Sequence, residues 1–131
     1  MNTEIELHDS TLAAVGFSRA EAVLSLRPAY IHRSSGRPGI DHGTGWVQDA
    51  TITIFNASAT ELPVRLPADV SEGGLCVADK LYQNILPVLD STGEAVVVEL
   101  LLVTAEKLSI RGNGIRIRFS GAAKYVEDFR P

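Results

Sequence analysis

The sequence predicts an all-β fold, a single antiparallel β-sandwich or small barrel of roughly eight or more short strands. Apolar and polar side chains alternate with period two along most of the chain, and β-branched residues are frequent there. Gly, Asn and Pro interrupt these segments at intervals of roughly ten residues, as turns do between strands. No window of helical length carries a sustained apolar stripe. With 45% apolar and 21% charged residues, residues 1–131 are expected to form one domain with its own core.

Four strands are expected in the first part of the chain: Thr3–Leu7, Leu12–Phe17, Ala22–Tyr30 and Trp46–Asn56. The polar residues 18–21 predict a hairpin between the second and the third. Residues 32–45 read HRSSGRPGIDHGTG, with four Gly and one large apolar residue. This composition predicts a long loop between the third and fourth strands, and long loops are commonly functional or mobile.

The rest of the chain is expected to contribute a short strand at Leu75–Val77 and a helical turn or further strand at Lys80–Leu86. Pro63 and Pro67 indicate an edge or an irregular connection, because proline has no N–H to donate within a sheet. Residues 96–103 are apolar on both faces, as in a strand of a barrel wall. Residues 122–129 are expected to form a closing strand or a short helix.

Asn113-Gly114 predicts a two-residue hairpin turn, because a type I′ turn needs positive φ at both central positions. In that register one face is apolar and is expected to pack against Val98, Leu100, Leu102, Ile52 and Ile54; it carries Leu108, Ile110, Ile115, Ile117 and Phe119. The other face carries Lys107, Arg111, Arg116 and Arg118. We interpret these cations as a solvated face neutralised by acids of a neighbouring strand, Glu99 first, rather than as a cationic patch.

Charge and cysteine content narrow the function classes. A net charge of −4 provides no field that attracts phosphate or anionic lipid, so neither nucleic acid nor a membrane is expected as a partner. The single cysteine, Cys76, allows no internal disulfide. The acidic and polar N-terminus lacks the basic, then apolar pattern of a signal peptide. We therefore expect a cytoplasmic protein.

The sequence contains no recognisable catalytic or cofactor signature. The glycine spacings match neither GxGxxG nor a P-loop, no GxSxG elbow is present, and no HxH or HExxH pair fixes two metal ligands on one element. No cofactor is expected on these grounds. Scattered His and Asp side chains could still hold a divalent transition metal if the fold gathered them. The weak candidates are His8, His32, His42 and Asp41, with Asp9 and Asp49 as further carboxylates. His8-Asp9-Ser10 is equally well explained as a turn.

The predicted 32–45 loop is the leading candidate for a binding site. Tyr30 and Trp46 flank it, and its polar residues include Arg33, Arg37, Asp41 and His42. Such a set suits an anionic small molecule or an acidic partner surface. The alternative is that Tyr30 and Trp46 are core residues that anchor the loop ends, and the sequence leaves both interpretations open.

The segments IELHDSTL, AYIH, PGIDHGTGWVQDA, YQNILPV and GNGIRIRFSGAAKYVEDF resemble a family of small uncharacterised bacterial β-sandwich proteins. The resemblance spans nearly the whole chain and implies the fold but no activity.

The leading functional hypothesis is a non-enzymatic module that binds an unknown small ligand or protein through the 32–45 loop. One alternative is a small metal-dependent hydrolase or other enzyme that uses the His and Asp residues around this loop. Another is an immunity or accessory protein for a bacterial toxin, by analogy alone. A homodimer is expected through exposed strand edges.

Overall fold

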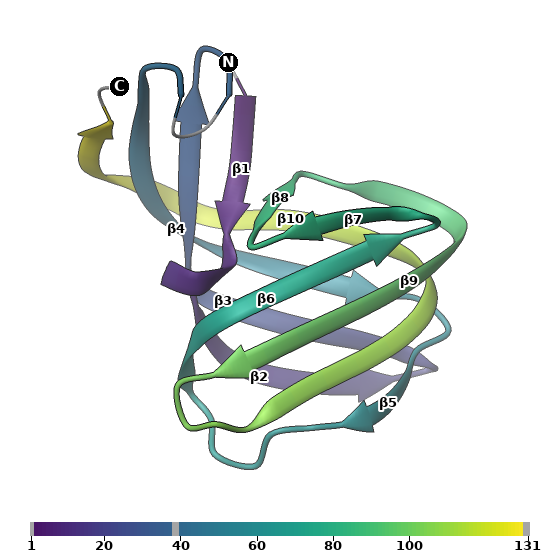
Figure 1. Cartoon of the computed structure of the whole chain (residues 1–131). Helices are drawn as coiled ribbons and strands as arrows, with labels where there is room; N and C mark the ends of the chain where they lie inside the picture. Colours follow the sequence, from purple (N-terminus) through teal and green to yellow (C-terminus); the bar gives the residue numbers. More distant parts are fainter. Residues whose placement is uncertain (1, 38–39, 130–131) are drawn as a thin grey trace.

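The computed structural model describes residues 2–37 and 40–129, and these are built almost entirely from strands (Figure 1). In chain order the elements are β1 (Asn2–Glu6), the 3-10 turn η1 (Leu7–Asp9), β2 (Thr11–Ser18), β3 (Glu21–Ser34), β4 (Gly43–Ile54), β5 (Ser58–Glu61), β6 (Ala68–Val77), β7 (Lys80–Gln83), β8 (Ile85–Pro87), β9 (Asp90–Leu102) and β10 (Lys107–Phe129). The all-β prediction is confirmed. Within the described residues no helix has the length and apolar character that crossing a membrane requires.

Six strands form a ring of hydrogen-bonded neighbours, in the order β2-β6-β9-β10-β4-β3. The ring closes because β2 pairs with β3 on one side and with β6 on the other. The contact with β6 is short, only Thr11↔Asp69 and Leu12↔Ala68. The remaining strands lie beside this barrel: β5 pairs with β10, β7 pairs with β6, and β1 and β8 continue the sheet from β3.

Aliphatic side chains at alternate positions of the ring strands fill its interior. The predicted apolar face is buried, since Leu108, Ile110, Ile115 and Ile117 are at most 1% exposed and Phe119 packs against the same cluster. That cluster also contains the predicted partners Ile52, Ile54, Val98, Leu100 and Leu102. The core prediction is therefore confirmed.

The hairpin predicted at Asn113-Gly114 is wrong, because β10 is one strand of 23 residues that runs through these positions. The residue after β4 lies beside it: Phe55 N–H donates to Gly114 O (3.1 Å), and Asn113 N–H donates to Phe55 O (2.7 Å). A β-bulge between Asn113 and Gly114 shifts the register against β9. Ile110 and Ile115 consequently both face the core although they are an odd number of positions apart. A hairpin and a bulge produce the same apolar pattern, and the pattern alone does not separate them.

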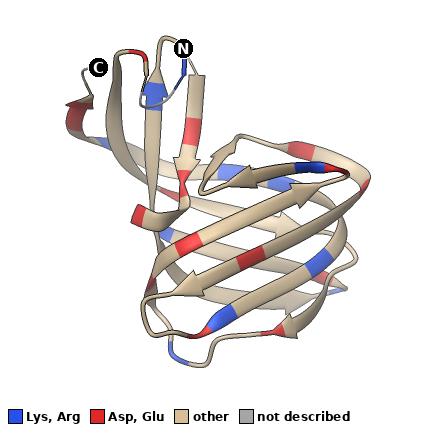
Figure 2. Ribbon diagram, in the orientation of Figure 1, with Lys and Arg blue, Asp and Glu red and all other residues tan. Residues whose placement is uncertain are grey.

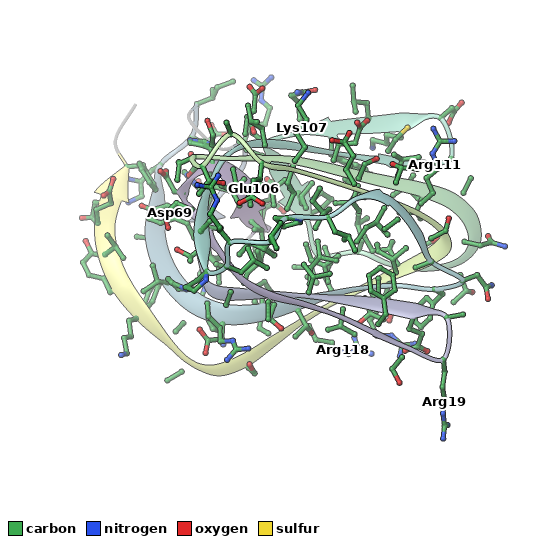
Figure 3. All side chains as sticks on the ribbon, turned by 90° about the horizontal axis from the view of Figure 1, so that it is seen from below. Arg19, Asp69, Glu106, Lys107, Arg111 and Arg118 are labelled. Carbon is green, nitrogen blue, oxygen red and sulfur yellow. The ribbon has the colours of Figure 1, made fainter. Side chains whose placement is uncertain are left out.

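The course of β10 also separates the cations that the hairpin register placed together. Lys107 pairs with β9 whereas Arg118 pairs with β4, and Figure 3 shows Lys107 and Arg111 on the opposite side of the barrel from Arg118. For two of these cations the acid close by is not the predicted Glu99. Arg116 and Arg118 each lie 3.6 Å from the carboxylate of Asp90, not of Glu99.

The segment predicted as a 14-residue loop is mostly strand. β3 continues to Ser34, β4 begins at Gly43, and these two residues pair, so residues 35–42 alone connect the strands. Pro38 and Gly39 lie outside the described residues. The loop was predicted because the segment is rich in glycine. A Cβ at Gly43 would lie 2.7 Å from Arg33 O, so this glycine is required by a close contact within the sheet and not by a loop.

These strand extensions form a second feature, which we call the projecting sheet. It consists of residues 2–6, 29–34, 43–48 and 124–129, and it rises from one end of the barrel (Figure 1). Two irregularities mark its base, one in β3 between Leu26 and Ala29 and one in β10 between Ser120 and Lys124. Bulges bend a strand, and here they turn both strands away from the barrel wall.

Candidate functional site

One face of the projecting sheet is polar at its base. Residues opposite one another in antiparallel strands share a face, and the pairs Glu6↔Tyr30, His32↔Gly45 and Glu127↔Gly45 place these side chains on the same side. The intervening Ile5 and Ile31 point the other way and are fully buried. Figure 2 shows acidic positions on β1, on η1 and near the end of β10.

The carboxylate of Glu6 lies between two imidazoles. Its Oε1 is 2.5 Å from His8 Nε2, its Oε2 contacts His32 Nε2, and Asp9 Oδ2 is 3.6 Å from His8 Nε2. The side chains of Glu6 and His32 are only 12% and 10% exposed, whereas those of His8 and Asp9 are 40% and 53% exposed. Glu6, His8 and Asp9 each offer a ligand atom within 4.8 Å of the others. His32 is not a member of this group, and it contacts the other oxygen of the same Glu6 carboxylate.

Ser10 fixes the turn that carries His8 and Asp9. Its buried hydroxyl donates to Glu6 O (2.7 Å) and accepts the N–H of Tyr30 (2.9 Å). Its own N–H donates to Leu7 O (3.0 Å) and closes the 3-10 turn, while the Leu7 side chain enters the core. The turn is therefore attached to β3 beside Tyr30, which holds the imidazole of His8 over the polar face.

An open pocket of about 390 Å³ adjoins the cluster, lined by Glu6, Asp9, Tyr30, His32, Glu127 and Phe129. Phe129 stacks on the His32 ring, with centroids 4.4 Å apart and planes 13° apart. The Tyr30 ring meets His32 edge-on at 5.5 Å. These two aromatic contacts restrict the orientation of the His32 imidazole.

Tyr30 is a hydrogen-bond donor at neutral pH. Burial, followed by the charges of Glu127, Glu6 and Asp9, raises the pKa of Tyr30 from 10.0 to about 12, and a hydrogen bond to Glu127 acts in the same direction. Gly45 makes room for the phenol, since a Cβ there would lie 2.9 Å from Tyr30 Cζ and 3.1 Å from Phe129 Cε2.

The six predicted ligand-binding residues are distributed over three places. Tyr30 lines the pocket. Arg33 and Trp46 lie on the opposite face of the projecting sheet, where the Arg33 guanidinium stacks 4.5 Å from the Trp46 ring centroid. Arg37, Asp41 and His42 belong to the 35–42 connection, in which the Asp41 carboxylate accepts the N–H of Arg37 (2.5 Å).

The predicted metal candidates divide in the same way. His8 and His32 meet at Glu6. Asp41 and His42 belong to the connection at the far end of the projecting sheet, beyond the pair Asn2↔Ser34. Asp49, a further carboxylate, pairs with Ser120 in β10.

The sequence analysis did not identify three residues that line this pocket, which are Glu6, Glu127 and Phe129. A signal for Glu6 exists, because Glu6 alternates with the buried Ile5 and Leu7 just as His32 alternates with Ile31. Both side chains should therefore leave the core on the polar face. Glu127 and Phe129 carry no such signal, since their place depends on the bulges in β10.

Comparison of the chain with family models, curated proteins and solved structures finds no match.

Proposed function

We propose that this protein is a binding module for a divalent transition-metal ion, held by His8, His32, Glu6 and Asp9. The observation that carries the proposal is the convergence of two imidazole Nε2 atoms on one carboxylate, with a second carboxylate beside them. Neutral imidazole and carboxylate are ligands that Zn²⁺ takes in four-coordinate sites. Mixed N and O donors of this kind also suit other divalent transition metals.

The competing explanation is a structural ion pair that merely satisfies Glu6. One histidine would be enough for that purpose, and the second comes from a separate element with a side chain that is 40% exposed. The Phe129 and Tyr30 rings restrict His32 in the way that outer-shell contacts orient metal ligands. An ion held by all four side chains would need both imidazoles to move away from Glu6 and His8 to move toward His32, which lies outside the group formed by Glu6, His8 and Asp9. The exposure of His8 allows that movement.

Calorimetric titration of the metal-free protein with ZnCl2 tests the proposal. We expect one saturable site per chain, and His32→Ala should weaken it by at least about a hundredfold, because the loss of outer-shell partners alone costs 10- to 100-fold. His8→Ala should weaken binding in the same direction. His42→Ala is the matched control, since His42 is the third histidine of the chain and lies in the 35–42 connection.

Equal zinc affinity in the wild-type, His32→Ala and His8→Ala proteins would show that the cluster is only a structural ion pair. The same conclusion would follow if His42→Ala weakened binding as much as His32→Ala. Circular dichroism of each variant separates lost binding from lost folding.

A metal-dependent hydrolase is the second candidate, favoured by the open pocket beside the cluster. A metal-bound water has a lowered pKa, and the protonated Tyr30 phenol could donate to an oxyanion. Zinc-dependent release of p-nitrophenol from p-nitrophenyl acetate would support it, provided that Tyr30→Phe removes turnover and leaves zinc affinity unchanged. Zinc binding without turnover would favour the binding module.

A further inference from the structure

A groove of about 490 Å³ crosses the outer wall of the barrel. It shares no lining residue with the polar pocket. It runs over β7, β6, β9, β10 and β5, and the residues that line it include Glu61, Glu72, Gly74, Leu81, Glu99 and Lys107. Its volume falls in the range of small-molecule sites. β7, β6 and β9 lie side by side on this wall (Figure 1).

The strand register gives the groove an apolar row and a polar row. Leu81, Cys76 and Val97 are successive cross-strand partners, and they form an apolar row in which Leu81 is 64% exposed. The row ends at Arg111 of β10, the partner of Val97. The next row contains Gln83, Gly74, Glu99, Ser109 and Glu61, again as successive partners. Glu99 thus stands beside a position that has no side chain.

Neither backbone conformation nor packing explains the glycine at position 74. Its φ is not positive, and a Cβ there would meet nothing closer than Tyr82 O at 3.6 Å, an ordinary contact. Its neighbour Gly73 differs, since a Cβ there would lie 2.6 Å from Leu100 Cδ2. Glycine in a strand interior weakens the strand and often marks close approach of a ligand or another backbone. At Gly74 its effect is to keep the groove open.

The charge of the groove indicates what would fill it. Glu61, Glu72 and Glu99 contribute three carboxylates against the one ammonium of Lys107. Among the described residues none of these four groups takes part in an ion pair. An apolar floor with an excess of negative charge at its rim complements a ligand with a hydrocarbon body and more than one cationic end.

We propose that this groove binds an aliphatic polyamine, with two ammonium groups at Glu99 and Glu61, which flank Ser109, and the rest of its methylene chain over Val97, Cys76 and Leu81. Charge-assisted hydrogen bonds to the carboxylates would hold these two ammonium groups. This inference is independent of the metal site, because the two share no residue.

Titration with spermidine at low ionic strength, followed by calorimetry, tests the inference. We expect one saturable site in the wild-type protein. Gly74→Leu should fill the groove and weaken binding by at least about tenfold, a change of about 1.4 kcal/mol. Gly16→Leu is its matched control, since Gly16 is also a strand glycine with open space around it and no positive φ.

Charge variants separate a site from general attraction to an acidic protein. Glu99→Gln should weaken spermidine binding, whereas Glu94→Gln removes the same charge from an exposed position outside the groove and should leave it unchanged. His32→Ala should also leave it unchanged. The inference is overturned if no saturable binding occurs at millimolar spermidine, if Gly74→Leu and Glu99→Gln both bind as the wild type does, or if Glu94→Gln weakens binding as much as Glu99→Gln.

Discussion

The surroundings of Tyr30 change its pKa clearly. Its phenol lies among Glu127, Glu6 and Asp9, and burial together with these charges raises its pKa to about 12. In the unfolded chain the phenol has the ordinary value of 10.0. The raised pKa therefore contributes stability in full below pH 10, and that contribution is lost as the pH rises toward 12.

Glu127→Gln should lower the pKa of Tyr30, because it removes the negative charge that raises this pKa most and leaves only burial, Glu6 and Asp9 to raise it. The measurement is ultraviolet absorbance against pH, with Tyr30→Phe used to assign the transition. Glu94→Gln serves as the control for net charge. A Tyr30 transition at the same pH in the wild type and Glu127→Gln would contradict this account of the polar face.

The sequence was enough to recognise candidate site residues but not to predict which of them are in contact. His8 and His32 were recognisable as metal-ligand candidates because imidazole is a common ligand. Their meeting at Glu6 depends on the register between β1 and β3, and a single sequence does not give that register. The register of β3 and β4 likewise decides which of the predicted ligand-binding residues share a face. Arg33 and Trp46 lie on the opposite face from Tyr30, a consequence of the strand that replaced the predicted loop.

At the scale of the element, β10 is the most informative case. The side chains that it buries could be predicted, since their alternation is strict on both sides of Asn113-Gly114. Its path could not, because Asn-Gly favours a turn and only the neighbouring Phe55 shows that the strand continues. Positive φ at two successive turn residues occurs instead at Arg19-Ala20, between β2 and β3.

Gly112→Ala tests the path of β10. A Cβ at this position would overlap Ile54 Cγ2 and Phe55 O, so the substitution should destabilise the protein by about 1–3 kcal/mol, the usual cost of overpacking. Gly16→Ala, at an open strand position, should raise stability by about 0.4–1 kcal/mol. Urea unfolding measures both. A neutral Gly112→Ala would indicate a free hairpin in place of the crossing with Phe55.

At the scale of the whole molecule, composition and periodicity were enough to predict strands and a core but not how the sheet closes. Closure depends on two residue pairs between β2 and β6, which lie far apart in sequence. The projecting sheet was missed because Gly43 and Gly45 have the composition of a loop while serving close contacts between strands. Homodimerisation through free strand edges stays a prediction.

Ile117→Asp should unfold the protein. Ile117 is 1% exposed in the barrel core, where burial of a large aliphatic side chain contributes about 1.5–3 kcal/mol and an unpaired carboxylate adds a desolvation cost. Ile40→Asp is the control, because Ile40 is 53% exposed in the 35–42 connection. Thermal melting followed by circular dichroism should show a cooperative transition for Ile40→Asp and none for Ile117→Asp. A cooperative melt of soluble Ile117→Asp would contradict the core.

The most direct test of the metal site is anomalous X-ray diffraction, at the zinc edge, from crystals of the protein grown with ZnCl2. The account predicts one anomalous peak between β1, η1 and β3, with His8 Nε2, His32 Nε2 and a Glu6 oxygen each at about 2.0–2.2 Å from it. An occupied zinc site elsewhere, or Glu6 still in direct contact with both imidazoles and no peak between them, would contradict it.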